Sequence, residues 1–210
     1  MPCRRARGRT RTADGIPSVR VRSVREDHEV STYLALLRGI NVSRHQRIAM
    51  ADLRALLTGL GYTDVATHLQ SGNALFRSGG TPEALAGEIE AAIATELGLT
   101  VRVLVRSGDE LRRVVEANPL AEVATDPSKL LVTFLSAPTA DADLDAVDPS
   151  GYAPEVMAIG SREVYVWYPD GVRKAKLSPL FFEKRYPAEA RAAATARNWN
   201  TLTKLVTMLG

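Results

Sequence analysis

Three short polar clusters are the parts of this sequence whose side chains could bind a ligand. Each lies beside the end of a predicted strand or the start of a predicted helix. Arginine donates paired hydrogen bonds to a carboxylate or a phosphate, and a helix N-terminus offers unpaired backbone N–H groups to an anion. The clusters therefore predict a pocket for a small anionic ligand or a nucleotide. Its candidate residues are Arg38, Asn41, Gln70, Ser71, Asn73, Arg197, Asn198, Trp199 and Thr201.

A structural role is the alternative for the same residues. Asparagine and serine side chains satisfy backbone groups in tight turns and at helix starts. Asn198 or Asn200 would then cap the last helix, while Trp199 packs against the body of the protein. If Trp199 is exposed instead, its ring is a surface on which a ligand could stack. The sequence leaves both interpretations open.

Most other chemistries lack the residues that they need. The histidines, His28, His45 and His68, have no spacing that makes a metal site, and the single cysteine, Cys3, does not join them. Ser71 does not lie in a G-x-S-x-G motif, and the chain has no G-x-x-x-x-G-K phosphate loop. We therefore predict neither a metal nor a cofactor. An enzyme of unidentified reaction is an alternative, although no general base stands out.

The positive charge of the chain is concentrated in residues 1–30. This segment contains eight arginines and four acidic residues, whereas the whole chain has 27 basic and 24 acidic residues. The remainder is nearly neutral and lacks the excess charge that drives binding to nucleic acids. A nucleic-acid-binding module is therefore an alternative that is not favoured. Tyr33 and Phe76 lie on predicted central strands, but the aromatic motif of RNA-binding sheets is missing, so we expect both rings in the core.

The same segment, residues 1–30, shows no hydrophobic period, and we expect a disordered basic tail. Translation from Val30, read as methionine, would leave this tail out of the native protein. No apolar run approaches the roughly 18 residues that a membrane-spanning helix needs. We expect a soluble, cytoplasmic protein without a membrane partner, and the sequence does not specify its oligomeric state.

Hydrophobic periodicity predicts alternating strands and helices in residues 31–106. Their order is β-α-β-β-α-β, which is the ferredoxin-like arrangement of an antiparallel sheet with two helices on one face. We expect the loop after the first strand and the hairpin turn to lie at opposite ends of this sheet, so Arg38 and Ser71 need not share a site. The predicted strands are residues 32–37, 65–69, 74–77 and 101–105, and the predicted helices are residues 50–60 and 81–97.

Residues 107–210 predict a second α+β half packed against the first. A capping box from Ser107 to Glu110 begins its first helix. The succession of helix and strands suggests a degenerate copy of the first half, although no repeat is visible in the residues. The predicted strands are residues 129–135, 156–159 and 163–168, and the predicted helices are an acidic one at 140–147, an alanine-rich one at 189–196 and a final one at 202–209.

Four motifs in this chain resemble the family called domain of unknown function 1697. They are TYLALLRGINV at residues 32–42, M-x-x-L-R at 50–54, LQSGN at 69–73 and TARNWNT at 195–201. The resemblance covers residues 31–209 and implies a compact bacterial α+β protein whose biochemical role is not established. Relatives have a glycine-rich loop where this chain has Ser43, Arg44 and His45. This departure argues against ligand binding through bare backbone in that loop.

Overall fold

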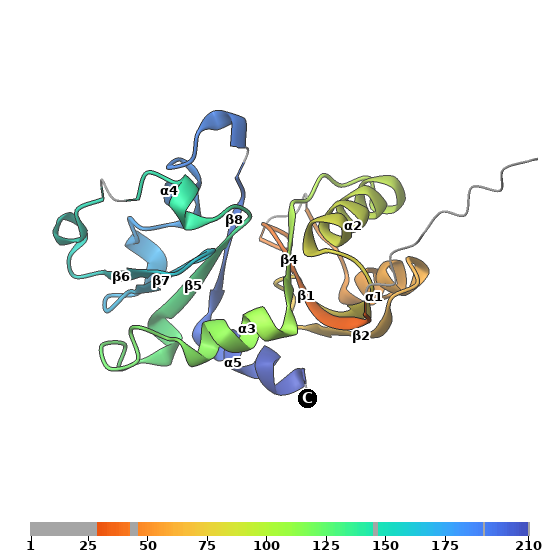
Figure 1. Cartoon of the computed structure of the whole chain (residues 1–210), viewed down its shortest axis with the longest axis horizontal. Helices are drawn as coiled ribbons and strands as arrows, with labels where there is room; N and C mark the ends of the chain where they lie inside the picture. Colours follow the sequence, from red (N-terminus) through yellow and green to blue (C-terminus); the bar gives the residue numbers. More distant parts are fainter. Residues whose placement is uncertain (1–28, 43–45, 145–146, 191, 210) are drawn as a thin grey trace, which may run out of the picture.

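Two antiparallel four-stranded sheets and five α-helices make up the described part of the chain, as the ribbon drawing shows (Figure 1). The computed structural model describes residues 29–42, 46–144, 147–190 and 192–209. The tail predicted at residues 1–30 lies almost entirely outside this range. The mixed α+β class expected from the sequence is confirmed.

The first sheet carries two helices on its outer face (Figure 1). Its strands lie in the order β2-β3-β1-β4, and every neighbouring pair is antiparallel. Alternate residues of β1 separate the two faces: Tyr33 and Ala35 pack under the helices, and Leu34 and Leu36 face the second sheet. The elements are β1 (Ser31–Leu37), α1 (Met50–Gly59), β2 (Thr63–His68), β3 (Asn73–Ser78), α2 (Pro82–Leu97) and β4 (Val103–Ser107).

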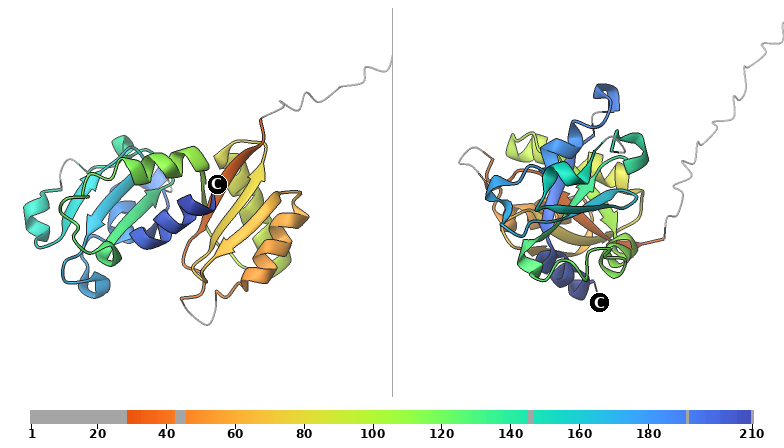
Figure 2. Two further views of the ribbon diagram at one scale, coloured as in Figure 1. Left: turned by 90° about the horizontal axis from the view of Figure 1, so that it is seen from below. Right: turned by 90° about the vertical axis from the view of Figure 1, so that its left-hand side faces the viewer.

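The second sheet repeats the strand order of the first. Its strands lie in the order β6-β7-β5-β8, so that β5 takes the place of β1 and β8 the place of β4. One helix follows β4 and another follows β8, and these two helices pack together beside both sheets (Figures 1 and 2). The elements are α3 (Gly108–Glu116), β5 (Leu130–Leu135), β6 (Val156–Ile159), β7 (Glu163–Trp167), α4 (Pro179–Glu183), β8 (Ala194–Asn198) and α5 (Trp199–Met208).

Three hydrophobic cores hold the layers together. The first lies between the first sheet and helices α1 and α2, and it contains Tyr33 (6% exposed) and Phe76 (0% exposed), as expected. The second lies between the two sheets and helices α3 and α5, where Leu34 and Phe134 belong to one cluster. The third lies on the far face of the second sheet, around Phe182 of α4. The middle core contains buried residues of both sheets.

Side-chain caps begin four of the helices where the residue types predict them. Thr81 accepts from the Ala84 amide at the start of α2, and Ser107 with Glu110 forms the predicted capping box of α3. Asn198, rather than Asn200, caps α5 by accepting from the Asn200 amide. Helix α4 starts in the same way, at Ser178.

The helix predicted at residues 189–196 is wrong, because the described part of this segment contains the end of a 3-10 turn, Ala188–Ala190, and the start of strand β8. Alanine has the highest intrinsic helix propensity, and that propensity motivated the prediction. In the structure Thr195 pairs with Phe134 and Ala196 with Thr133, so β8 forms an edge of the second sheet. Burial against β5 outweighs a preference worth less than about 1 kcal/mol per residue.

The acidic helix predicted at residues 140–147 is also absent from the described residues. A single 3-10 turn, Thr139–Asp141, stands near its start, and residues 145–146 lie outside the description. The Thr139 hydroxyl donates to the Gly160 carbonyl at 2.6 Å, so this turn is held by the connection between β6 and β7.

Candidate functional site

Two buried arginines occupy equivalent places in the two sheets. Arg106 lies near the end of β4, directly before the helix cap Ser107, and Arg197 lies near the end of β8, directly before the helix cap Asn198. Arg106 is 3% exposed and Arg197 is 6% exposed. Each therefore carries its charge into the interior between the sheets.

Each arginine donates to a backbone carbonyl of the opposite sheet. Arg106 bonds the carbonyl of Leu135, the last residue of β5, and Arg197 bonds the carbonyl of Leu37, the last residue of β1, at 2.8 Å. Each also bonds the carbonyl of the residue that precedes it. The pair forms a reciprocal clamp between the halves of the chain.

Protein acceptors occupy all three nitrogens of the Arg197 guanidinium. Burial lowers its pKa to about 10, since water no longer solvates the cation. Its hydrogen bonds instead satisfy the charge and stabilise the contact between the halves. The acceptors are the Asn73 and Thr195 side chains and the carbonyls of Leu37, Ser71, Gly72 and Ala196.

The loop after β1 and the β2–β3 turn meet at one end of the sheet, so the expectation of opposite ends is wrong. Strand β3 runs antiparallel to both β1 and β2, so the end of β1, the end of β2 and the start of β3 share one edge. The Leu37 amide donates to the Gly72 carbonyl at 2.9 Å. Gly72 has a φ of +75°, and a Cβ there would lie 2.8 Å from Leu37 Cβ, so this close approach requires glycine.

Asn41 connects the loop after β1 to the β2–β3 turn. Its side-chain amide donates to the carbonyls of Ile48 (3.0 Å) and Gln70 (2.7 Å), and its oxygen accepts from the Ile48 amide. Arg38 turns toward the second half and pairs with Glu183 at 2.8 Å. The structure thus joins Asn41 with Gln70, and Asn73 and Ser71 with Arg197, while Arg38 points to a different partner.

The remaining predicted residues surround the start of α5. Asn198 donates to the Ser128 carbonyl at 2.6 Å in addition to capping the helix. Trp199 is half-buried and packs against the middle core, and Thr201 is half-buried in the first turn. Ligand binding by these residues stays a prediction, and the contacts described here are those of turns, caps and packing.

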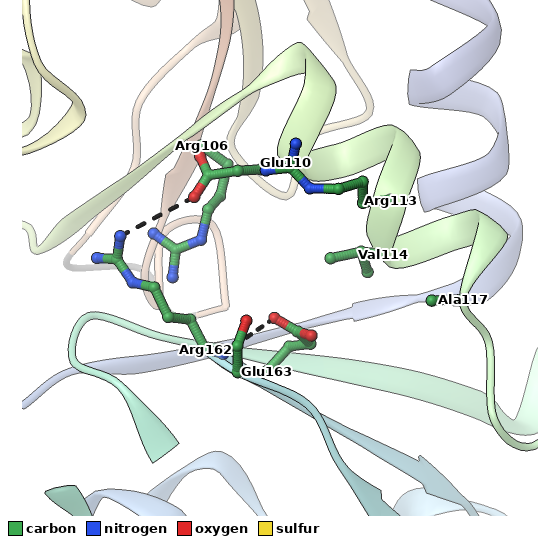
Figure 3. Close-up of a pocket in the computed structure, with 8 residues that line it drawn as sticks. Arg106, Glu110, Arg113, Val114, Ala117, Arg162 and Glu163 are labelled. Atoms are coloured by element: carbon green, nitrogen blue, oxygen red, sulfur yellow. Dashed lines mark hydrogen bonds and ion pairs between the residues drawn. The ribbon is translucent and has the colours of Figure 1, made fainter. Parts of the chain in front are cut away.

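A cavity of about 250 Å³ lies beside Arg106, between helix α3 and the β6–β7 connection (Figure 3). Arg106 donates one hydrogen bond to Val105 and one to Leu135. A guanidinium has five N–H groups, and the residues that the structure describes provide no acceptor for the other three. The cavity is lined by Arg106, Glu110, Arg113, Val114, Ala117, Ser161, Arg162 and Glu163.

The two halves differ at the position beside each arginine. Glu163 pairs with the penultimate residue of β5, just as Asn73 pairs with the penultimate residue of β1. Asn73 accepts from Arg197, whereas the Glu163 carboxylate accepts from the Arg162 amide at 3.1 Å and makes no hydrogen bond to Arg106. Beside Arg197 the equivalent space is filled by protein atoms, whereas beside Arg106 it is a cavity.

The cavity has more positive than negative side chains. Arg162 lies across from Arg106 and contacts Glu83 (3.3 Å) and Glu110 (4.0 Å), as Figure 3 shows for Glu110. Burial, and then the charge of Arg162, lowers the pKa of Arg106 to about 10, while the nearby carboxylates partly offset this effect. Arg113 is exposed at the rim. Three arginines and two glutamates make the lining complementary to an anion.

The residues of this cavity were not predicted from the sequence. A sequence pattern that points to them is an arginine followed by a capping residue where a strand leads into a helix. It occurs at residues 106–107 and again at 197–198. Only the pattern at 197–198 was identified from the sequence, because it lies in the TARNWNT motif at residues 195–201. The described part of the chain contains no group of three or more histidine, cysteine and carboxylate side chains that could hold a metal.

The fold and this cavity define an α+β protein in which two sheets of the same strand order pack together and a charged cavity lies between helix α3 and the β6–β7 connection. The pattern of a protein family of unknown function, DUF1697, matches residues 30–165, and the chain belongs to this family. The resemblance of the sequence motifs is thereby confirmed, although residues 195–201 lie beyond the match.

A solved structure has a similar fold over most of the chain. The chain is similar to the conserved bacterial protein SP0830 from Streptococcus pneumoniae, with 25% identity and a TM-score of 0.61 over 86% of this chain and 99% of that one. No curated protein sequence matches the chain. Among the described residues, no helix has the length and apolar character needed to cross a membrane.

Proposed function

We propose that the protein binds a small anion in the cavity beside Arg106. The observation that carries the proposal is a guanidinium that is 3% exposed and donates only two hydrogen bonds to the described residues. A buried cation with spare N–H groups is strongly stabilised by an anion that accepts them, because little water competes inside the protein. Arg113 and Arg162 add positive charge around the same space.

The size of the cavity restricts the ligand. Pockets for drug-sized molecules have volumes of about 300–1,000 Å³, and this one has about 250 Å³. Inorganic phosphate or a short dicarboxylate suits this volume better than a nucleotide does. Nucleic acid is disfavoured here, since the central arginine lies between the sheets rather than on an outer surface.

The ferredoxin-like class of the first half is part of the same proposal. It is supported by the chain order β1-α1-β2-β3-α2-β4 and by the strand order β2-β3-β1-β4. A cytoplasmic location is part of the same proposal.

Thermal unfolding with inorganic phosphate or succinate tests the anion site. Near-saturating ligand should raise Tm by about 5 °C or more, because binding at 100 times Kd stabilises by about 2.7 kcal/mol. Arg106→Met should abolish the ligand-dependent rise, and Arg113→Ala should reduce it. Glu163→Gln should enlarge it at subsaturating ligand, because that change removes a negative charge from the lining.

Arg77→Ala is the matched control. Arg77 is exposed and pairs with Asp64 on the first sheet, away from the cavity lining. Comparing Tm with and without ligand for each variant separates lost binding from lost stability. An equal rise in the parent protein and in Arg106→Met would contradict the proposal, as would a parent Tm that neither ligand changes.

A further inference from the structure

A second cavity, of about 430 Å³, lies in the second half of the chain and shares no lining residue with the Arg106 cavity. It is formed where the segment before β6 meets the turn after β7. Its volume falls within the range of pockets for small organic ligands. The lining consists of Tyr152, Ala153, Pro154, Glu155, Tyr168, Pro169, Asp170, Gly171, Arg173 and Lys176.

Apolar rings form part of the wall of this cavity. Tyr152 and the rings of Pro154 and Pro169 line it, and Tyr168 is buried beneath. Phe181 packs edge-on against the Tyr152 ring, with ring centroids 5.3 Å apart, so the orientation of this ring is fixed by protein contacts. A fixed aromatic ring beside proline rings is a surface on which a planar group stacks.

Two cations at the rim form no ion pair within the part of the chain that the structure describes. Arg173 and Lys176 are exposed, and within the described residues neither side chain forms an ion pair or a hydrogen bond. The Glu155 carboxylate is engaged elsewhere, since it accepts from the Lys176 and Leu177 amides at 3.0 and 3.2 Å. These bonds fix the backbone that carries Lys176.

The turn on the other side of the cavity is held in a similar way. Lys129 donates to the Pro169 carbonyl at 2.7 Å, and the Gly171 amide donates to the Tyr168 carbonyl at 2.8 Å. Asp170 in this turn is exposed and lines the same rim. A carboxylate there can accept from a hydroxyl of a bound molecule.

We propose that this cavity binds a nucleoside monophosphate. The base stacks on Tyr152 between the proline rings, the phosphate lies between Arg173 and Lys176, and a ribose hydroxyl donates to Asp170. The apolar rings of the lining match the base of this ligand, and the two cations match its phosphate. A lone phosphate leaves the apolar walls uncovered, and a lone nucleoside leaves the two cations without an anion.

Calorimetric titration of the full chain with adenosine monophosphate, adenosine and inorganic phosphate tests the site. The monophosphate should bind at one site, at least about tenfold more tightly than adenosine, because a hydrogen bond to a charged group is worth that much or more. Arg173→Ala combined with Lys176→Ala should weaken the monophosphate about tenfold and leave adenosine unchanged. Tyr152→Leu should weaken both, while Tyr152→Phe should keep the binding of both.

Arg106→Met provides the control that separates this site from the anion cavity. Monophosphate binding should be the same in this variant as in the parent protein, even if phosphate binding between the sheets is lost. Absence of saturable monophosphate binding would overturn the proposal. So would monophosphate binding that is unchanged in the double Arg173 and Lys176 variant, or lost in Arg106→Met protein that remains folded by circular dichroism.

Discussion

At the scale of the residue, the two equivalent arginines have different roles because their neighbours differ. Arg197 meets the neutral amide of Asn73 and a ring of backbone carbonyls, so the protein itself satisfies its guanidinium. In the lining beside Arg106, Glu163 stands at the position equivalent to Asn73, and its carboxylate accepts from a backbone amide instead. One position is thus a structural clamp, and the other is the candidate anion site.

Replacing Arg197 by lysine should strongly destabilise the protein. A lysine ammonium has three donors on one nitrogen and cannot reach acceptors on both sheets, so Asn73 and several carbonyls lose their partner. We expect a loss of about 3–5 kcal/mol in the free energy of unfolding, as for other broken buried charge networks. Urea denaturation measures this loss.

Arg106→Lys and Arg77→Lys are the comparisons for that experiment. Arg106 donates to two carbonyls rather than to six acceptors, so its replacement should cost less, and exposed Arg77 should cost under about 0.5 kcal/mol. If Arg197→Lys costs no more than Arg106→Lys, the assignment of Arg197 as the clamp is incorrect.

At the scale of the element, the junction of β8 and α5 depends on Asn198. Its oxygen accepts from the Asn200 amide and caps the helix, and its nitrogen donates to the Ser128 carbonyl before β5. The same side chain therefore begins the helix and attaches it to the 3-10 turn Pro127–Lys129, which precedes β5. The alanine-rich segment before it is a strand only because β5 pairs with it.

Two substitutions should separate the roles of Asn198. Asn198→Ala removes both hydrogen bonds and should cost about 2 kcal/mol, roughly 1 for the cap and 1 for the second bond. Asn198→Asp keeps the cap and loses the donor, so it should cost about half as much. Chemical denaturation gives both values, and Asn200→Ala, at an exposed position, should be close to neutral. Equal losses for Asp and Ala would show that the cap contributes nothing.

At the scale of the whole molecule, the middle core couples the two sheets. Leu34 and Leu36 of the first sheet and Val132 and Phe134 of the second belong to this core, together with residues of α3 and α5. The reciprocal arginines cross the same boundary. We therefore expect the two halves to unfold together rather than as separate domains.

Alkaline unfolding tests this coupling, because each core contains a tyrosine with a raised pKa. Burial is the main cause at Tyr62, Tyr165, Tyr168 and Tyr186, and at Tyr62 a hydrogen bond to Glu88 adds to it. Burial raises the pKa of Tyr186 to about 12. The folded state holds these protons more tightly than the unfolded chain, whose tyrosines titrate near about 10. The stability that they contribute is therefore complete below pH ~10 and is lost as the pH rises toward 12.

Tyrosinate absorbance and circular dichroism, followed over this pH range, should change together in a single transition. All four tyrosines should ionise as the protein unfolds, since they lie in cores that are connected through the two sheets. Ionisation of Tyr62 in one step and of Tyr168 in a separate, later step would mean that the halves are independent. Tyrosine-to-phenylalanine variants assign each step.

The local features were set by short stretches of sequence. The strands and helices of the first half and the capping box at Ser107 depend on residues within a few positions of one another, so propensity and spacing were sufficient to predict them. The motif at residues 69–73 was also found, because its polar residues follow a strand.

Only the tertiary structure decided which of these segments pair and which side chains come into contact. It turned residues 194–198 into a strand, joined the β1 loop to the hairpin turn, and placed Arg106 opposite Leu135. The physical reason is that burial and the pairing of charges depend on residues far apart in the chain, whose contact no local pattern records. An arginine followed by a capping residue occurs at position 106 and again at position 197. The fold places Glu163 beside Arg106, where a cavity is present, and Asn73 beside Arg197, where protein atoms fill the space.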